Sequence, residues 1–263
     1  MKSVLITGAA GGMGKAAVKI FKERGYRVFA LDVADCPYEE GIAYIKCDVT
    51  SEESVAEAYN AVKSQTDSLF AILHYAGIYM LDSLVEMSAE SFKKIFDVNM
   101  QGVFLVNKTF LPLLSNGSRV LITTSELAPL DPLPFTGIYA VTKAALDKYA
   151  YSLRMELQLL GIDVSVLRAG AVETDMIGAS TKALERFINK TELYSCNAKR
   201  FREIVDGVEA RRIPPQKIAE KSFKILEKRR PKFAYAINRN PLLLMLNALP
   251  RRFQLWVIKM ILK

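Results

Sequence analysis

The feature that most constrains the fold of this chain is a regular alternation of short apolar runs and longer amphipathic stretches. The apolar runs are nearly continuous in Val, Ile, Leu, Ala and Phe, as expected for strands covered on both faces. They are Ser3–Thr7, Arg27–Leu31, Ala43–Cys47, Leu69–Tyr75, Arg119–Thr124, Asp163–Leu167 and Phe233–Ala236. The stretches with helical periodicity are Met13–Arg24, Ser51–Ser64, Ala89–Leu114, Tyr139–Leu160 and Pro215–Arg229. This order predicts a three-layer α/β fold with a doubly wound, mostly parallel seven-stranded sheet.

The chain shows no internal repeat and no low-complexity linker, so we expect one domain over residues 1–263. Two segments depart from the alternation. Residues 176–212 are polar and basic and follow the sixth strand, beyond whose carboxyl end open α/β sheets bind ligands. We therefore expect a substrate lid there. The second segment is the tail, residues 240–263.

Charge is distributed unevenly along the chain. Residues 199–263 contain 17 Lys and Arg against 5 Asp and Glu, whereas residues 1–198 contain 19 against 23. A basic end suggests an anionic partner, such as nucleic acid or a membrane surface. The sequence lacks the aromatic–basic alternation and the Cys/His modules of nucleic-acid readers, so we expect no nucleic-acid partner.

Cysteine usage and the first residues indicate a compartment. The three cysteines are scattered and lack CxxC spacing, which predicts reduced, buried thiols. No signal-peptide pattern precedes the first apolar run. We expect a cytoplasmic protein, with peripheral contact to a membrane surface as an open alternative.

The first chemical motif is the glycine-rich stretch from Thr7 to Gly14, placed between a predicted strand and a predicted helix. Gly8, Gly12 and Gly14 allow a tight turn and close approach of a phosphate to the backbone N–H groups at the helix start. In this context the motif predicts a dinucleotide site, to which Met13 also belongs.

Asp32 ends the second predicted strand, 18 positions after Gly14. A carboxylate there accepts hydrogen bonds from both ribose hydroxyls of adenosine and repels a 2′-phosphate. The sequence places no Arg or Lys to receive that phosphate, because Ala10 and Gly11 occupy the loop and Val33 follows the acid. We therefore expect NAD(H) rather than NADP(H).

The third motif is Tyr139 and Lys143, four residues apart on a predicted helix and so on one face. A nearby cation stabilises a phenolate, so we expect Lys143 to lower the pKa of Tyr139. Ser125, at the end of the fifth strand, is expected to hold a substrate oxygen, with Thr124 and Glu126 as competitors for this place. The apolar, proline-rich residues 127–135 suggest a hydrophobic pocket wall.

Together these motifs resemble the short-chain dehydrogenase/reductase family over essentially the whole chain, nearest in character to its hydroxysteroid and retinol dehydrogenases. The family pattern TGxxxGxG matches residues 7–14, and its Asn-Ser-Tyr-Lys tetrad matches Asn99, Ser125, Tyr139 and Lys143. The resemblance implies a Rossmann-type fold and a homodimer or homotetramer. It also implies that Asn99 holds a water linking Lys143 to solvent, and that Lys143 contacts the nicotinamide ribose.

Further cofactor contacts are implied by the same resemblance. They are Asp48 and Val49 beside the adenine, Ala76 and Gly77 after the fourth strand, and Val172 and Thr174 at the nicotinamide carboxamide. The chain departs from the family where His74 and Tyr75 replace two asparagines, so another group must satisfy the backbone there. His74 is the only histidine; we expect it beside the cofactor, with a catalytic role as the lesser alternative.

The tail consists of two apolar stretches separated by Pro250, Arg251 and Arg252, so a membrane-spanning helix is not expected. Its second half is amphipathic and suits either a membrane interface or packing against protein. No metal site is expected.

The sequence thus predicts an NAD(H)-dependent oxidoreductase that interconverts an alcohol and a carbonyl, with an apolar substrate such as a steroid, retinoid or fatty alcohol. A non-catalytic dinucleotide-binding sensor or scaffold, including one at a membrane surface, is the alternative from another class.

Overall fold

The computed structural model describes residues 1–36, 39–209 and 211–263, apart from the side chains of residues 175–180, 182 and 204–209. Its centre is a seven-stranded sheet in the order β3-β2-β1-β4-β5-β6-β7, in which all paired strands are parallel. The strands are β1 (Ser3–Thr7), β2 (Arg27–Asp32), β3 (Ile42–Lys46), β4 (Ala71–His74), β5 (Arg119–Ser125), β6 (Asp163–Ala169) and β7 (Ala234–Ile237). The doubly wound parallel sheet expected from the sequence is confirmed.

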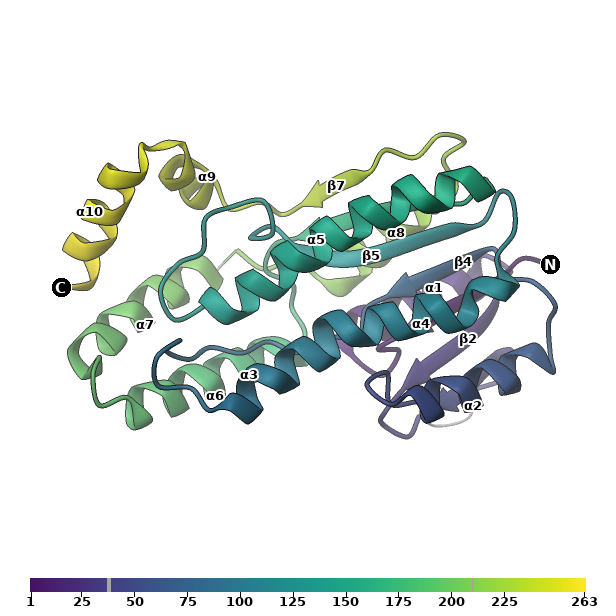
Figure 1. Cartoon of the computed structure of the whole chain (residues 1–263), viewed down its shortest axis with the longest axis horizontal. Coiled ribbons are helices and arrows are strands. Elements are labelled where there is room, and N and C mark those ends of the chain that lie inside the picture. Colours follow the sequence, from purple (N-terminus) through teal and green to yellow (C-terminus); the bar gives the residue numbers. More distant parts are fainter. Residues whose placement is uncertain (37–38, 210) are drawn as a thin grey trace.

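Helices cover both faces of the sheet (Figure 1). One layer contains α1 (Gly12–Glu23) and α8 (Pro215–Leu226), and the opposite layer contains α2 (Glu52–Lys63), α4 (Gly102–Phe110) and α5 (Gly137–Leu157). Neighbouring positions of β1 face opposite layers: Val4 and Ile6 pack with the α1–α8 side, and Leu5 packs with the α2–α4 side. This two-sided burial explains why the strand sequences do not alternate between apolar and polar residues.

The stretch from Ala89 to Leu114, expected as one helix, is divided in the structure. It consists of α3 (Ala89–Phe96), a π-helical segment (Asp97–Gln101), α4 and a 3-10 turn (Leu111–Leu113). A second 3-10 turn (Gln158–Leu160) follows α5. Side-chain periodicity does not distinguish π from α turns, and π segments often occur at functional sites.

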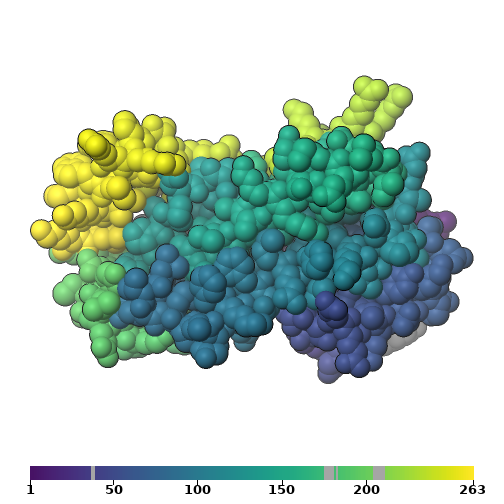
Figure 2. Space-filling view, in the orientation of Figure 1, coloured from purple at the N-terminus to yellow at the C-terminus, as the bar shows by residue number. Residues whose placement is uncertain are grey.

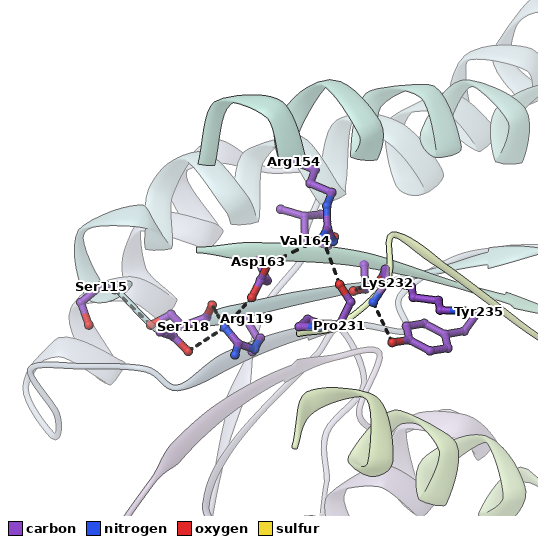
Figure 3. Close-up of polar contacts among 11 residues, drawn as sticks. Ser115, Ser118, Arg119, Arg154, Asp163, Val164, Pro231, Lys232 and Tyr235 are labelled. Carbon is purple, nitrogen blue, oxygen red and sulfur yellow. Dashed lines mark hydrogen bonds and ion pairs between the residues drawn. The ribbon is translucent and has the colours of Figure 1, made fainter. Parts of the chain in front are cut away.

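The amino ends of β5 and β6 are held by a polar network at the edge of the sheet (Figure 3). Asp163 pairs with Arg119 at 2.9 Å and with Arg154 at 3.7 Å. Arg154 also donates to the carbonyl oxygens of Val164 and Pro231, which links α5 to the segment before β7. Functional groups gather at the other, carboxyl edge, so this network fixes the scaffold without entering the site.

Beyond the carboxyl edge, four helices form a cap (Figure 1). They are α6 (Asp175–Lys190), α7 (Ser195–Glu209), α9 (Pro241–Ala248) and α10 (Arg251–Leu262). The expected lid at 176–212 thus contains a helical pair, although residue 210 and the side chains of 176–180, 182 and 204–209 lie outside the described residues. The cap has its own apolar cluster, which includes Phe135, Phe187, Phe201 and Leu262.

Two smaller expectations concern the whole chain. Within the described ranges, every helix is too short or too polar to cross a bilayer.

The cysteines are unpaired, but only Cys47 is buried, whereas Cys36 is partly exposed and Cys196 is exposed. The expectation that all three thiols are buried is therefore wrong, because helix α7 turns Cys196 outward.

Candidate active site

The glycine-rich loop joins β1 to α1. Glycine is needed there both for its backbone conformation and because a side chain would clash with neighbouring atoms. Gly8 has a φ of +68°, and a Cβ there would lie 2.5 Å from the Ala76 backbone nitrogen. A Cβ on Gly14 would lie 2.0 Å from the Gly8 carbonyl oxygen, and one on Gly12 would lie 2.7 Å from Thr174 Cγ2. The loop therefore packs directly against the segments that follow β4 and β6.

The amino end of α1 presents free backbone N–H groups next to this loop. Lys15 N–H donates to the Gly11 carbonyl, so the N–H groups of Gly12, Met13 and Gly14 belong to the first turn, which has no intrahelical acceptors. Such a turn carries partial positive charge and suits a phosphate.

Asp32 is fixed beside the same loop. Its Oδ2 accepts from Ala10 N–H at 2.9 Å, and its Oδ1 accepts from Ala34 N–H at 3.0 Å. The loop and the acid, distant in sequence, thus share one edge of the sheet because β1 and β2 are neighbouring parallel strands.

The other expected cofactor residues lie along this edge. Asp48 Oδ1 accepts hydrogen bonds from both the backbone N–H and the hydroxyl of Thr50. Val49 is buried against Gly102, where an added Cβ would lie 2.7 Å from Val49 Cγ2. Val172 forms a parallel bridge with Ile213.

Ser125 and Tyr139 are brought together at the carboxyl end of β5. Their hydroxyl groups interact, and the Ser125 Oγ also accepts from Leu127 N–H at 3.2 Å. The competitors from the sequence are engaged elsewhere. Thr124 donates to Asp147 at 3.3 Å, and Glu126 accepts from Asn240 N–H at 2.5 Å. The geometry therefore favours Ser125 over both neighbours.

Lys143 lies beside Tyr139, with its Nζ 5.7 Å from the centre of the phenol ring and 3.3 Å from the Thr123 carbonyl oxygen, to which it donates. Burial lowers the pKa of Lys143 to about 8. Burial also raises the pKa of Tyr139 to about 12, against a lowering contribution from Ser125. The expected lowering of the Tyr139 pKa is therefore wrong for this geometry, because desolvation of the phenolate outweighs the favourable contacts.

Asn99 lies in the π-helical segment and is fully buried. Its Oδ1 accepts from Ile78 N–H at 2.8 Å, and its Nδ2 donates to the Ile78 carbonyl and to Thr142 Oγ1. A Cβ on Gly77 would lie 3.2 Å from Asn99 Oδ1 and 3.5 Å from Lys143 Nζ. Asn99 thus braces the chain after β4 against α5, and Gly77 leaves room for both polar side chains.

His74 is buried against α4. Its Nε2 lies 2.9 Å from Asn107 Oδ1, while Asn107 Nδ2 donates to Tyr149, so His74 Nε2 carries the hydrogen. Burial lowers the pKa of His74 to about 4. The backbone after β4 is satisfied instead by Thr7, whose carbonyl accepts from Tyr75 N–H and whose hydroxyl accepts from Ala76 N–H. The buried hydrogen bond to Asn107 gives the His74 side chain a structural role.

Two aromatic residues, one beside the phenol and one in the cap cluster, were not singled out from the sequence. The Tyr79 ring centre lies 4.9 Å from that of Tyr139. Phe135 has a φ of +64° and packs its ring against Phe187, Tyr194 and Phe201 of the cap. A positive φ is uncommon for a bulky residue and often marks a functional segment. Only the apolar character of residues 127–135 pointed to this wall.

Comparisons with known proteins identify the family of the chain. The family described as short chain dehydrogenase matches residues 2–185. A protein of Schizosaccharomyces pombe named NADPH-dependent 1-acyldihydroxyacetone phosphate reductase is 32% identical over 192 residues, covering 69% of this chain and 65% of that protein. Estradiol 17-beta-dehydrogenase 2 of Mus musculus is 33% identical over 192 residues, covering 68% of this chain and 50% of that protein. The chain therefore matches between half and two thirds of the length of these relatives.

Solved structures share the fold. A short chain dehydrogenase family protein from Francisella tularensis superposes with a TM-score of 0.75 at 24% identity, covering 90% of this chain and 97% of the other. The 3-ketoacyl-(acyl-carrier-protein) reductase from Brucella melitensis, solved with NADH, gives a TM-score of 0.73 at 20% identity, covering 90% and 96%. At these identities the likeness concerns the architecture.

Proposed function

The chain belongs to the short-chain dehydrogenase family, and we propose that it is an NAD(H)-dependent oxidoreductase that interconverts an alcohol and a carbonyl on an apolar substrate. The observation that carries this proposal is the convergence of Ser125, Tyr139 and Lys143 at the sheet edge that also holds the glycine-rich loop and Asp32.

The residues at this edge fit a nicotinamide dinucleotide. Gly8, Gly12 and Gly14 form a backbone cradle that any Cβ would fill, and the first turn of α1 supplies donors for a diphosphate. Thr174 lies against this cradle, and its role is proposed as a contact with the nicotinamide end. When bound, the dinucleotide accepts or supplies the hydride.

Asp32 supports NAD(H) as the preferred form. Its carboxylate accepts from Ala10 and Ala34, which fixes it beside the loop, where it would repel a 2′-phosphate. One relative is named as NADPH-dependent, so the preference is a property to be measured for this chain.

The proton chemistry follows from the buried side chains. A phenol with a raised pKa is protonated at neutral pH, so Tyr139 donates its proton to a carbonyl oxygen in the reductive direction and recovers it in the oxidative direction. Ser125 holds the substrate oxygen by a hydrogen bond. The Lys143 ammonium favours the phenolate that remains after proton donation, and Asn99 keeps the adjoining segment in place for a water-mediated exchange with solvent.

An apolar substrate is supported by the cap. Tyr79 next to the phenol joins the apolar cluster formed by Phe135, Leu184 and Phe187, so the reacting carbon faces a largely apolar surface. Steroids, retinoids and fatty alcohols have the required character.

The test is a substitution that removes a single oxygen. Tyr139→Phe keeps the buried ring but removes the proton donor, so turnover should fall about 100-fold or more while NADH affinity stays within about twofold. Turnover is followed at NADH absorbance with a panel of apolar alcohols and ketones, and NADH binding by fluorescence titration. Tyr151→Phe, the same change at an exposed tyrosine of α5, is the matched control and should leave both quantities unchanged. Unchanged turnover in Tyr139→Phe would contradict the proposed role of Tyr139 as proton donor and with it the proposed activity.

A dinucleotide-binding sensor is the competing function. It predicts NADH binding without turnover of any alcohol or ketone in the panel. The buried Tyr139 and Lys143 favour the enzyme, because burying two ionisable groups without a chemical use is costly.

Self-association is proposed from the outer face of α4 and α5. Phe104, Val141 and Met155 on these helices are between 41% and 48% exposed, and a homodimer or homotetramer would cover them. Light scattering measures this state, and Met155→Glu should shift it toward the monomer.

We also propose peripheral contact between the tail and an anionic membrane surface. Trp256 and Met260 on α10 are more than half exposed, Phe253 stacks on Trp256, and Arg252 and Lys259 are exposed on the same helix. The tail forms one end of the molecular surface (Figure 2). Flotation with anionic liposomes tests the contact, and Trp256→Glu should weaken it.

A further inference from the structure

The loop between β4 and α3 (residues 75–88) is attached to the lid helices α6 and α7 through one carboxylate. Glu86 Oε2 accepts from the Thr191 hydroxyl at 2.7 Å, and Glu86 Oε1 accepts from the N–H groups of Glu192 and Leu193 at 2.9 and 3.2 Å. All three donors belong to the turn that joins α6 to α7. The hydrogen bond from Thr191 in particular holds the pKa of the Glu86 carboxyl below its usual range, so this group is charged at neutral pH.

This attachment is more specific than an ordinary surface ion pair. Hydrogen bonds to a charged acceptor are stronger than those between neutral groups, and backbone N–H groups in a turn between two helices need an acceptor. A second contact joins the same two segments, because Lys190 Nζ lies 3.6 Å from Asp82 Oδ2, but Lys190 is exposed and such a pair contributes little. Glu86 is therefore the stronger of these two attachments.

The same loop also contacts the candidate catalytic phenol. The ring of Tyr79 is tilted by 57° against that of Tyr139, with 4.9 Å between the ring centres. Asn99 fixes the residue before Tyr79 through its backbone N–H and carbonyl. Asp82 N–H donates to the carbonyl of Phe135, four residues before Tyr139, at 2.9 Å. The loop thus lies between the lid turn and the reacting groups and is fastened to both.

Apolar packing follows the same route. Tyr79 packs against the cap cluster, in which Phe187 belongs to α6 and Phe201 belongs to α7. Leu81, two residues further along the loop, is a buried member of this cluster. Because a close-packed cluster has little free space, a displacement of α6 and α7 is passed on to the ring of Tyr79.

We propose that Glu86 is a positioning residue, which holds the turn between α6 and α7 against the β4–α3 loop, and that Tyr79 on this loop transmits the position of the lid to Tyr139. The inference rests on the proposed oxidoreductase function and deepens it. Glu86 acts through the loop, since its carboxylate is engaged by the lid turn. When this carboxylate is absent, the turn separates from the loop, and the Tyr79 ring no longer keeps the phenol in the orientation that proton transfer requires.

The first measurement is hydrogen exchange of the full chain, followed by mass spectrometry, which needs no substrate. Glu86→Ala should accelerate exchange of the amides of Glu192 and Leu193 about tenfold, because their acceptor is lost. Glu86→Gln should accelerate it less, since its Oε1 still accepts from both. Glu185→Gln changes an exposed carboxylate of α6 and should leave exchange unaltered. Equal exchange in the wild type and Glu86→Ala would overturn the inference.

The second measurement is turnover of the panel of apolar alcohols and ketones, below the Tm of every variant. Glu86→Ala should lower kcat about tenfold and leave NADH affinity within about twofold, because small displacements of a reacting group are costly. Glu86→Gln should recover part of this loss, and Glu185→Gln should show none. Tyr79→Ala should also lower kcat. The double variant Glu86→Ala with Tyr79→Ala should lose no more than Tyr79→Ala alone, because Glu86 acts through Tyr79.

A carboxylate with a merely structural role would give a different pattern. Glu86→Ala would then lower the Tm and reduce NADH binding and turnover in parallel, and its loss in kcat would multiply with that of Tyr79→Ala. Either result overturns the inference while the proposed function stands. If the wild type turns over no alcohol or ketone of the panel, the proposed function is wrong and the inference falls with it.

Discussion

The buried His74 predicts a specific loss of stability in mild acid. The side chain is 2% exposed, and its pKa is lowered from 6.5 to about 4 because burial disfavours the imidazolium. Below pH 6.5 the unfolded chain takes up a proton at this position that the folded chain does not, so the free energy of unfolding falls as the pH falls toward 4. Each pKa unit corresponds to about 1.4 kcal/mol, so His74 alone should remove about 3 kcal/mol over this interval. Above pH 6.5 the effect should be absent.

The assay compares urea unfolding of the wild type and His74→Gln at pH 7 and at pH 4.5. The glutamine amide keeps a donor for Asn107 but does not titrate, and carboxylates common to both proteins cancel in the comparison. The wild type should lose about 2 to 3 kcal/mol more than the variant between the two pH values. Parallel losses in the two proteins would refute the reasoning, because they would mean that His74 is protonated in the folded state.

Three further perturbations test the cofactor cradle and the cap. Asp32→Ser should improve NADPH affinity about tenfold or more and weaken NADH affinity, as measured by fluorescence titration. An unchanged ratio of the two affinities would show that Asp32 does not determine the choice between NADH and NADPH. Gly14→Ala places a Cβ 2.0 Å from the Gly8 carbonyl, so NADH affinity should fall at least about tenfold, and retained affinity would contradict the described loop. Phe187→Ala, at a fully buried position of the cap cluster, should cost about 3 kcal/mol and expose α6 and α7 to limited proteolysis, whereas unchanged cleavage would show that the cap packs by other contacts.

The architecture was predictable because each strand is buried on two sides. Near-continuous apolar runs such as Ser3–Thr7 are readable without tertiary context, and the boundaries of β1 were predicted to the residue. The cap was not predictable in the same way. Its helices α6 and α7 lie in a stretch rich in polar and basic residues, and apolar positions such as Leu184, Phe187 and Phe201 find their partners only within the cap.

The candidate site was predictable where chemistry requires fixed spacing. Tyr139 and Lys143 share a helix face by geometry, and the glycines must stand where the backbone is crowded. The sequence already favoured Ser125 over Thr124 and Glu126, and what the structure adds is the partners that engage these two neighbours.

What sequence reasoning missed depends on burial. The direction of the Tyr139 pKa shift is set by desolvation, and the buried Gln254 Nε2, which has no hydrogen-bond partner among the residues that the structure describes, becomes visible only when α10 is placed against the cap. Neither property leaves a pattern in the order of residues.

The most direct test of the account is the transfer of label between substrate and nicotinamide. An apolar secondary alcohol carrying deuterium on its carbinol carbon is incubated with NAD⁺ and the protein, and the NADH formed is analysed by mass spectrometry. The account predicts NADH one mass unit heavier with the wild type and almost none with Tyr139→Phe, although both proteins bind NADH. Bound NADH without transfer of deuterium from any alcohol of the panel would contradict it.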